Sequence, residues 1–595
     1  MRNKLFGASF GYALAFLLVA GSALGGDQAS LRKLDRALRQ AVDTRTDGSH
    51  RTIVHARPGR LAALRAWLLA HGDIIDGESP SLGIIITRLS PGHLAAVAEL
   101  TDSDRLSFDA PVAAFGGNSY RSRSGRDDRD DQGDPAPTVL RTTLGLDESS
   151  ATGNGIGVAV IDSGIQPSAD FDNRVLTMFD FVNAGGRRVA PYDDYGHGTH
   201  VAGLIGSNGV LGPEFTGVAP KVRLIALKVL DANGQGHTSD VITAIMFAID
   251  NRRQLGIDII NLSLGHPILE PAESDPLVQA VEAAVQAGIV VVTAAGNFGM
   301  NPETGMTGYA GITSPGNAPS ALTVGAFDHE GTATRGDDRV APYSSAGPTW
   351  YDGFAKPDIL APGNHLVSDA DSSQTLFQNE PRLQVDQHHL LLSGTSMATA
   401  VATGTVAVLL EANRDENPGR RNPPLTPNAV KAILQFTALR LHDDAGVEYD
   451  SLRQGAGGLN AGGAAALAAA IDTSAPIGTT WLTRGVNTFT RIAGEDLAWA
   501  QTIVWGTNIV WGTSVFENEP AWAQNIVWGT NIVWGTNIVW GTNIVWGTNI
   551  VWGTNIVWGT NIVWGTNIVW GTNIVWGTNI VWGTNIVWGT ALSLF

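Results

Sequence analysis

The sequence predicts an α/β fold with a mostly parallel sheet for the middle of this 595-residue chain, with a small α+β unit before it and a β-type repeat after it. Three observations carry this prediction. Residues 137–472 alternate short apolar runs with helical patterns, residues 52–112 do so on a smaller scale, and residues 502–595 repeat a hexapeptide. A chain of this length exceeds one domain of roughly 100 to 200 residues, so two or three folded units are expected.

The N-terminal segment, 1–25, has the three parts of a secretory signal peptide. Basic Arg2 and Lys4 precede an apolar stretch from Tyr12 to Ala20, and small residues follow it. This stretch is shorter than the roughly 20 apolar residues that span a bilayer, so a membrane anchor is the weaker interpretation. We expect residues 1–25 to be a signal peptide and the mature protein to be secreted, extracellular or on the cell surface.

A small βαββαβ unit is predicted within residues 26–112. Apolar runs that favour strands alternate with helically spaced segments, at 53–56, 59–71, 83–89, 91–100 and 105–112. The next residues, 113–136, have almost no apolar content and contain doublets of like charge. They are expected to form an exposed linker, because they lack the apolar surface needed to order themselves.

Residues 137–472 carry the predicted parallel sheet. Runs without polar alternation lie at 157–161, 224–229, 258–261 and 289–293. Such strands are covered on both faces, and the helices expected at 239–250 and 276–287 supply the cover.

The C-terminal part divides into an expected linker, 473–501, and a repeat region, 502–595. The unit Asn-Ile-Val-Trp-Gly-Thr occurs eleven times without change from Asn525 to Thr590, and no charged residue lies between Asn525 and Phe595. An even period puts alternate residues on opposite faces of an extended chain, and Gly-Thr-Asn can also turn, as in a β-helix or a stack of hairpins. A self-contained β-stack, a self-associating segment and an outer-surface attachment element all stay open.

Composition excludes several classes of function. Lys and Arg total 38 against 56 Asp and Glu, a net charge of −18, so the basic surface expected of a nucleic-acid binder is missing. The chain has no cysteine, which excludes disulfides, thiol nucleophiles and Cys-bound metals. A nucleophile must therefore carry oxygen or nitrogen.

Two segments hold an acid and two histidines. Residues 158–164 place Asp162 at the end of a buried strand, where α/β sheets carry functional groups, although Asp-Ser-Gly alone is typical of a turn. Residues 196–200, Gly-His-Gly-Thr-His, contain glycines that allow close approach to His197. Helical zinc proteases space two histidines four apart with a glutamate between them, which differs from this segment, so His200 is interpreted as a packed histidine.

Two further segments hold an amide and a hydroxyl. Residues 292–297 end in Asn297, which is either a turn asparagine or a donor aimed at developing negative charge. Residues 393–400 lead into an apolar helical run, 401–410. Ser396 lies at the start of that helix, where free amides and the helix dipole stabilise an oxyanion; a helix N-cap is the alternative.

Together, a strand-end aspartate, His-Gly-Thr-His, Ala-Ala-Gly-Asn and Gly-Thr-Ser-Met-Ala, in this order, resemble the subtilisin-like serine proteases, or subtilases. The chain order Asp, His, Ser is that of subtilisin and differs from chymotrypsin and the α/β-hydrolases. The resemblance covers residues 137–472 and implies a subtilisin-like three-layer domain. Residues 26–112 resemble, by pattern and position, the family's inhibitory propeptide, a ferredoxin-like domain that assists folding and is then removed.

The resemblance implies a secreted serine endopeptidase made as an autoprocessed zymogen. Ser396 is then the nucleophile, His197 the general base and acid, and Asp162 the group that orients His197. Asn297 and the Ser396 amide form the oxyanion hole. The remaining implied positions bind substrate, as a pairing edge (Gly234, Gln235, Gly236) and as walls of the primary pocket (Ser263, Leu264, Gly265, Ala294, Ala295, Gly296).

Four positions depart from the family pattern. Ala400 and Val401 replace a usual Pro-His pair, His266 stands where a second glycine is frequent, and Phe298 follows the oxyanion asparagine. We expect repacking around the first pair, and Phe298 favours apolar side chains at the cleavage site.

The expected partners are protein or peptide substrates and the chain's own propeptide as inhibitor, and no nucleic acid is expected. The chemistry needs no cofactor and no metal. Family members often hold structural calcium, but no loop here shows a defined ligand spacing. The alternative function is a surface or assembly protein that acts through its Trp-rich repeat, by associating with itself or contacting a cell surface, with proteolysis limited to its own maturation.

Overall fold

The computed structural model describes most of the chain between the N-terminal segment and the repeat. The described residues are 28–44, 48–115, 140–147, 151–301, 304–416, 423–505, 508–511 and 513–518, with short strand segments between 532 and 594. The predicted signal peptide and most of the predicted linker at 113–136 lie outside them.

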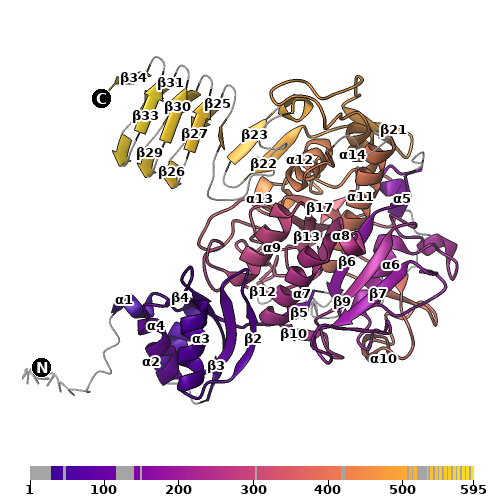
Figure 1. Cartoon of the computed structure of the whole chain (residues 1–595). Helices are drawn as coiled ribbons and strands as arrows, with labels where there is room; N and C mark the ends of the chain where they lie inside the picture. The colour runs from indigo at the N-terminus through magenta and orange to yellow at the C-terminus, as the bar shows by residue number, and fades with distance from the viewer. Residues whose placement is uncertain are drawn as a thin grey trace, which may run out of the picture.

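The N-terminal unit combines one antiparallel sheet with helices, in the order β1 (His50–Ala56), α3 (Leu61–Ala70), β2 (Ile75–Ser79), β3 (Ile84–Leu89), α4 (Pro91–Glu99) and β4 (Ser103–Phe108). Two short helices, α1 (Gln28–Leu31) and α2 (Arg36–Thr44), precede it. The strand order is β2-β3-β1-β4. This unit is the indigo part of Figure 1.

The two faces of this sheet pack against different partners. Val54 and Ile85 belong to a core with α3 and α4, whereas Ile53 and Ile84, one residue away, join a core of the central domain. Alternate strand residues point to opposite faces, so one sheet fills its own core and also docks on its neighbour.

The central domain contains, within the described residues, one nine-stranded sheet in the order β16-β15-β13-β11-β6-β9-β7-β8, with β17 beside β15. The strands are β6 (Gly157–Asp162), β7 (Val175–Asp180), β8 (Arg187–Val189), β9 (Arg223–Lys228), β11 (Ile259–Leu262), β13 (Val290–Ala294), β15 (Leu322–Asp328), β16 (Arg339–Val340) and β17 (Ile359–Pro362). Only the pairs β15/β16 and β7/β8 are antiparallel in this described sheet. The mostly parallel sheet predicted from the sequence is confirmed.

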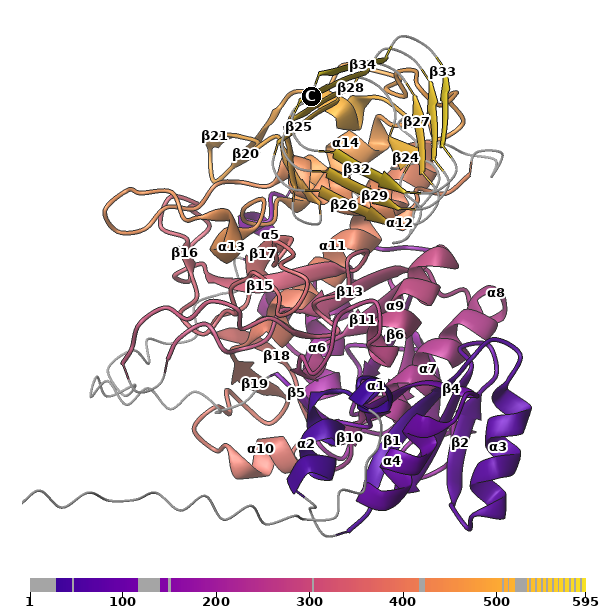
Figure 2. The same ribbon diagram turned by 90° about the vertical axis from the view of Figure 1, so that its left-hand side faces the viewer.

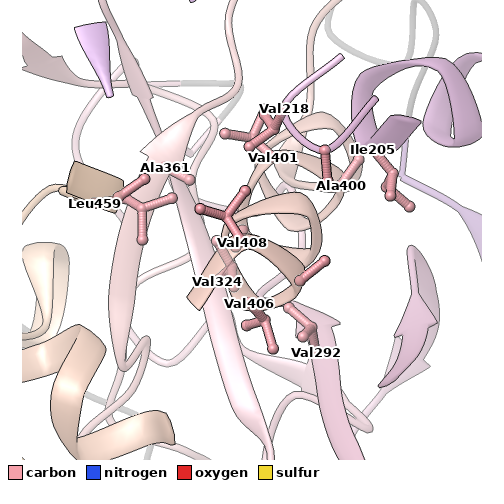
Figure 3. Packing of buried hydrophobic residues seen from close by; sticks show 14 of the residues in the cluster. Ile205, Val218, Val292, Val324, Ala361, Ala400, Val401, Val406, Val408 and Leu459 are labelled. Carbon is pink, nitrogen blue, oxygen red and sulfur yellow. The ribbon is translucent and has the colours of Figure 1, made fainter. Parts of the chain in front are cut away.

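Helices cover both faces of this sheet. On one face, Val158 and Val160 of β6 share a core with α6 (His197–Gly206) and α11 (Thr395–Glu416). On the other, Ala159 and Ile161 pack with α7 (Thr238–Asp250) and α9 (Pro276–Gln286). Figure 3 shows the first core, where α11 side chains lie among those of β13, β15 and α6. The two predicted covering helices match α7 and α9.

Helix α11 is long and apolar enough to cross a membrane, and among the described residues it is the only such helix. Its most apolar window is 94% buried inside the protein. That burial is typical of the central helix of a folded domain. The helix carries Ser396 near its first turn, so the same packing that buries it fixes the position of that serine.

Residues 473–501 were expected to be a linker, and the structure instead packs them on the central domain. The aromatic rings of Trp481 and Trp499 are buried in the core that contains α11, together with Ile503 and Val515 further along the chain. Backbone N–H groups of 500 and 501 bond to carbonyls of 438 and 436, just after and within α12 (Pro427–Thr437). Scattered apolar residues among Gly and Thr thus form part of a core, and the packed central domain continues past 472 to include Val515.

A variant of the hexapeptide, at 502–507, and one exact copy, at 508–513, precede the eleven copies. Their strands form an antiparallel hairpin, β22 (Thr502–Trp505) with β23 (Asn508–Trp511). The predicted repeat region therefore begins inside the central domain, because Gln435 of α12 exchanges hydrogen bonds of 3.1 and 3.2 Å with the backbone of Val504.

Later copies pair differently. From β24 (Ile532–Val533) to β34 (Ala591–Leu594), each strand pairs in parallel with the strand three copies further on, for example Asn537 with Asn555. Three hexapeptide copies thus complete one coil. Figure 2 shows the resulting three stacks of strands around the coil. The strands of the later copies thus pair in parallel at a spacing of three copies, whereas β22 and β23 pair antiparallel.

Candidate active site

The four chemical candidates lie along the carboxyl edge of the parallel sheet. Asp162 ends β6, Ser263 follows the neighbouring β11, and Asn297 follows β13, next in the sheet. Ser396 is tied to this edge, because its hydroxyl donates to the carbonyl of Ser263 at 2.8 Å. His197 reaches the same edge from the first residue of α6.

Asp162 and His197 form a buried pair. Nδ1 of His197 lies 2.8 Å from Oδ1 and 3.0 Å from Oδ2 of Asp162, and both side chains are shielded from solvent. A carboxylate only accepts, so Nδ1 carries the hydrogen and Nε2 is left as the basic nitrogen. The Ser163 amide also donates to Oδ1, at 2.7 Å, which fixes the carboxylate plane.

Glycines around His197 permit this approach, as predicted. Gly196 has φ = 111°, in the left-handed region that favours glycine, and it caps the start of α6. A Cβ on Gly198 would lie 2.2 Å from the carbonyl oxygen of Gly164 and 3.2 Å from Cβ of Asp162. The helix can pack this close to the end of β6 only with glycine at 198.

Ser396 and His197 are not hydrogen-bonded in this structure. The Ser396 hydroxyl donates to Ser263, and Nε2 of His197 is buried without a hydrogen-bond partner among the described residues. Catalytic hydrogen bonds in substrate-free sites are often long or poorly aligned and tighten only when the reacting complex forms.

Asn297 presents its amide nitrogen to the cleft. Its Oδ1 accepts from the backbone N and from Oγ1 of Thr395, at 3.0 and 2.9 Å, which identifies Nδ2 as the donor end of the amide. Nδ2 donates to the carbonyl oxygen of Phe115 at 3.0 Å. Sequence reasoning missed Thr395, although it lies within the Gly-Thr-Ser-Met motif.

The predicted pairing edge does pair with an added strand. Strand β5 (Pro111–Ala114) lies antiparallel between β10 (Gln235–His237) and β12 (Leu264–Pro267). The carbonyl of Gly234 accepts from the backbone N of Ala114 at 3.3 Å. The predicted linker boundary at 112 is therefore too early, because residues 113–115 are held by main-chain pairing.

The predicted pocket walls lie beside that strand. Leu264 and Gly265 of β12 pair with Ala114 and Ala113, and the Ser263 carbonyl accepts from the Phe115 N–H at 3.4 Å. Residues 294–296 are buried at the end of β13, where the Ala295 amide bonds to β15.

Two of the departures from the family pattern affect this region differently. The side chain of Phe298, which follows Asn297 in the chain, is 55% exposed rather than buried. His266 is buried, and its Nδ1 lies 2.8 Å from the carbonyl oxygen of Pro267. The expectation that Phe298 itself sets an apolar cleavage preference therefore gains no support from its position.

His200 is held as a packed histidine. Its Nε2 lies 3.2 and 3.1 Å from the carbonyl oxygens of Leu366 and Leu390. Burial, and then the neighbouring His197, lowers the pKa of His200 to about 3. No three His, Asp or Glu side chains gather as metal ligands in the part of the chain that the structure describes.

Two further groups, missed from the sequence, fix the geometry. Asp193 accepts from the backbone N of Gly196 at 2.8 Å and from N and Oγ1 of Thr199 at 2.9 and 2.7 Å, which locks the first turn of α6. Burial raises the pKa of Asp193, and these hydrogen bonds oppose the shift. Lys228, at the end of β9, donates to the Ser163 carbonyl at 2.6 Å. In the sequence, the signal that could have identified Lys228 is a lysine at the end of an apolar strand.

Fold, site and comparison agree on the class of protein. Residues 153–457 match Peptidase_S8, the Subtilase family. This match covers more than half of the chain, and the chain belongs to the subtilase family of serine proteases.

Several curated bacterial subtilases are similar in sequence. Serine protease AprX of Bacillus subtilis (strain 168) is 39% identical over 316 residues, which is 52% of this chain and 66% of that protein. Subtilisin E of the same strain is 35% identical over 298 residues, 50% of this chain and 64% of that protein. Subtilisin of Bacillus pumilus is 35% identical over 298 residues, which is 50% of this chain and 88% of that protein. The chain thus spans slightly less than two thirds of the first two relatives.

A solved structure shares the fold. Fervidolysin from Fervidobacterium pennivorans, described as a keratinolytic enzyme related to subtilisin, superposes with a TM-score of 0.51. The match covers 74% of this chain and 63% of fervidolysin at 20% identity, a level that supports similarity of fold alone.

Proposed function

We propose that this protein is a secreted serine endopeptidase with Ser396 as nucleophile, His197 as general base and acid, and Asp162 as the group that orients His197. The observation that carries the proposal is the Asp162–His197 pair of 2.8 Å at the same sheet edge as the Ser396 hydroxyl and the Asn297 amide. Nucleophile, base, orienting acid and oxyanion donor are the parts that acyl transfer requires.

Hydrolysis then proceeds in two halves. The Ser396 hydroxyl turns from Ser263 to His197 and attacks the substrate carbonyl carbon, while Nε2 takes its proton. Asn297 Nδ2 and the Ser396 amide stabilise the oxyanion. Nε2 gives the proton to the leaving amine, and water releases the acyl group by the same steps in reverse order. Asp162 stabilises the imidazolium that forms each time.

The N-terminal unit, residues 28–115, supports the proposal of a zymogen. Its last strand lies in the groove between β10 and β12, and main-chain pairing of this kind is how a protease edge holds an extended peptide. A unit that occupies the groove excludes other substrates. We therefore assign it the role of a propeptide that inhibits the enzyme in the same chain, with a ferredoxin-like order of strands.

The test of the enzymatic proposal is hydrolysis of an unrelated denatured protein by the processed chain. Activity that a serine-directed covalent reagent abolishes, and that the Ser396→Ala variant lacks, is the expected result. Absence of hydrolysis by the processed, folded wild-type chain would contradict the proposal. Intact-mass measurement of the exported protein tests removal of residues 1–25 and hence export.

The repeat supports a second role, self-association. Its strands stack in parallel and in register, for example Asn543 with Asn561. Strands of a second copy can adopt the same pairing pattern, and the repeat has no charged residue to oppose it. Sedimentation velocity should show association for the full chain and a monomer for a chain that ends at 518. Equal sedimentation coefficients, after correction for mass, would refute this role, and retention of the full chain on cells would favour a surface contact.

A further inference from the structure

The segment at the end of the N-terminal unit occupies the substrate groove with a defined register. Val112 pairs with Gly236 and Ala113 with both Gln235 and Gly265. The strand is thus sandwiched between two edges of the central domain, which leaves little freedom to slide by one residue, because a one-residue slip reverses every side chain.

The register is also fixed from the other end of the segment. Asp109 accepts from the backbone N of Ser239 at 2.8 Å and from its hydroxyl at 2.9 Å, at the start of α7. Arg51 holds Asp109 from within the N-terminal unit, with Nε 2.8 Å from the carboxylate. The carbonyl of Ala110 accepts from both N and Oγ1 of Thr238, each at 3.0 Å. From these anchors, the extended strand β5 leads directly to Phe115.

This register places the carbonyl of Phe115 at the oxyanion donor. Its oxygen lies 3.0 Å from Nδ2 of Asn297. A Cβ on Gly394 would lie 2.2 Å from the same oxygen, so a glycine at 394 is needed for the chain to come this near. The Ser263 carbonyl oxygen accepts both from the Ser396 hydroxyl, at 2.8 Å, and from the Phe115 backbone N–H, at 3.4 Å, so the hydroxyl and this peptide share one partner.

The ring of Phe115 lies against the wall of the primary pocket. A Cβ on Gly265 would lie 2.9 Å from Cε2 and 3.1 Å from Cζ of that ring. The side chain is only 9% exposed. The pocket therefore accommodates a full aromatic side chain, and the glycine at 265 provides part of the room.

From this register we infer that the chain cleaves itself on the carboxyl side of Phe115, and that the primary pocket selects aromatic side chains. The inference rests on the proposed function. Ser396 Oγ bonds to the Phe115 carbonyl carbon, the C–N bond to the next residue breaks, and His197 passes the serine proton to the departing nitrogen. Water then releases the Phe115 carboxylate and restores the serine. By sequence, the mature chain begins with Gly116-Gly117-Asn118.

The first test is the N-terminal sequence and intact mass of the processed full chain, beside the Ser396→Ala chain. We expect the wild type to begin at Gly116 and the variant to keep residues 111–115. A wild-type chain with another first residue, while it still hydrolyses a denatured protein, overturns the cleavage site and leaves the proposed function standing. Loss of both self-processing and hydrolysis by the folded wild-type chain overturns the function as well.

The second test changes the pocket residue in the full chain. Phe115→Tyr should be processed at a rate near that of the wild type, whereas Phe115→Asp should slow processing roughly 100-fold or more, because a carboxylate would enter an apolar pocket. Ile74→Asp is the matched control, since Ile74 is 68% exposed on the same unit and takes no part in the pairing of β5 with β10 and β12. Equal processing rates for Phe115→Asp and Ile74→Asp overturn the inference.

A peptide of residues 111–119, Pro-Val-Ala-Ala-Phe-Gly-Gly-Asn-Ser, removes folding from the comparison. The processed enzyme should cut it after Phe and cut the same peptide with Asp in that position at least about 100-fold more slowly. Cleavage elsewhere in the peptide, or equal rates for the two peptides, contradicts the aromatic preference.

Discussion

Thr395 donates two hydrogen bonds to one oxygen of Asn297, from its backbone N–H at 3.0 Å and from its hydroxyl at 2.9 Å. An amide side chain can exchange the positions of its oxygen and nitrogen by rotation, and two donors on Oδ1 make the exchanged state unfavourable. The residue next to the proposed nucleophile therefore decides which end of the Asn297 amide faces the Phe115 carbonyl.

We expect Asn297→Ala to lower kcat by roughly 10² to 10³ with little change in KM, because an oxyanion donor acts mainly in the transition state. Thr395→Val should lower kcat less, by about tenfold, since it removes one of two donors and keeps the shape. Thr395→Ser is the control and should stay near the wild type. Steady-state kinetics on a peptide substrate measure these effects, and a change confined to KM would argue against the assigned role.

Replacement of Ser396 by Ala should lower kcat by a factor on the order of 10⁶. The same variant should leave the precursor uncut in a host without other proteases, since the proposed self-cleavage uses the same serine. Gel analysis and mass spectrometry of the secreted protein give the readout. Normal maturation of this variant would show that another protease performs the processing.

The buried imidazole of His200 should make the domain sensitive to acid. Its pKa is lowered to about 3 in the fold, whereas an unfolded histidine titrates near about 6.5. Below pH 6.5 the unfolded chain binds a proton that the folded chain does not, so stability is present above that pH and falls as the pH drops toward 3. The equilibrium constant for folding should fall by up to about tenfold per pH unit from this group alone.

Urea unfolding of the Ser396→Ala chain at several pH values measures this slope, because that variant cannot digest itself. A second substitution, His200→Gln, should flatten the slope, whereas His388→Gln, at an exposed histidine, should not. If the dependence of stability on pH is the same in the His200→Gln variant, the acid sensitivity comes from other groups.

The two possible truncations of the C-terminus should behave differently. A chain that ends at 518 keeps Ile503, Val504 and Val515, all buried on the central domain, and should retain peptide turnover and thermal midpoint. A chain that ends at 501 loses all three. Each such loss costs roughly 2 to 5 kcal/mol, against a total stability of about 5 to 15 kcal/mol. Calorimetry and peptide turnover of both truncated chains test this prediction. Equal thermal midpoints for the two chains would show that the hairpin of β22 and β23 is dispensable for stability.

The sequence was sufficient for features that depend on pattern. Uninterrupted apolar runs located β6, β9, β11 and β13, and Asp162 and Asn297 lie at the end of β6 and three residues after the end of β13. The added strand in the groove also agrees with the predicted pairing edge at 234–236. Each of these depends on neighbours within a few residues of one another.

Features that depend on distant partners escaped sequence reasoning. Residues 473–501 were interpreted as a linker because their apolar side chains are sparse. Only the fold shows that Trp481 and Trp499 pack in one core with residues of α12. The end of the N-terminal unit was placed at 112 because nothing local marks Phe115 as a residue held by Asn297, 182 positions away. The Ser396 hydroxyl is bonded to Ser263, a partner that no motif spacing reveals.

The three-copy coil sets a rule for changes in the length of the repeat. Because strands pair with those three copies away, as Asn573 does with Ala591, gain or loss of three hexapeptides adds or removes one full coil. The terminal Ala-Leu-Ser-Leu strand then stays on the same one of the three stacks. Gain or loss of a single copy moves that strand to another stack, turning the C-terminus to a different side of the molecule. Variants with different copy numbers should thus fall into three classes, according to which of the three stacks holds the terminal strand.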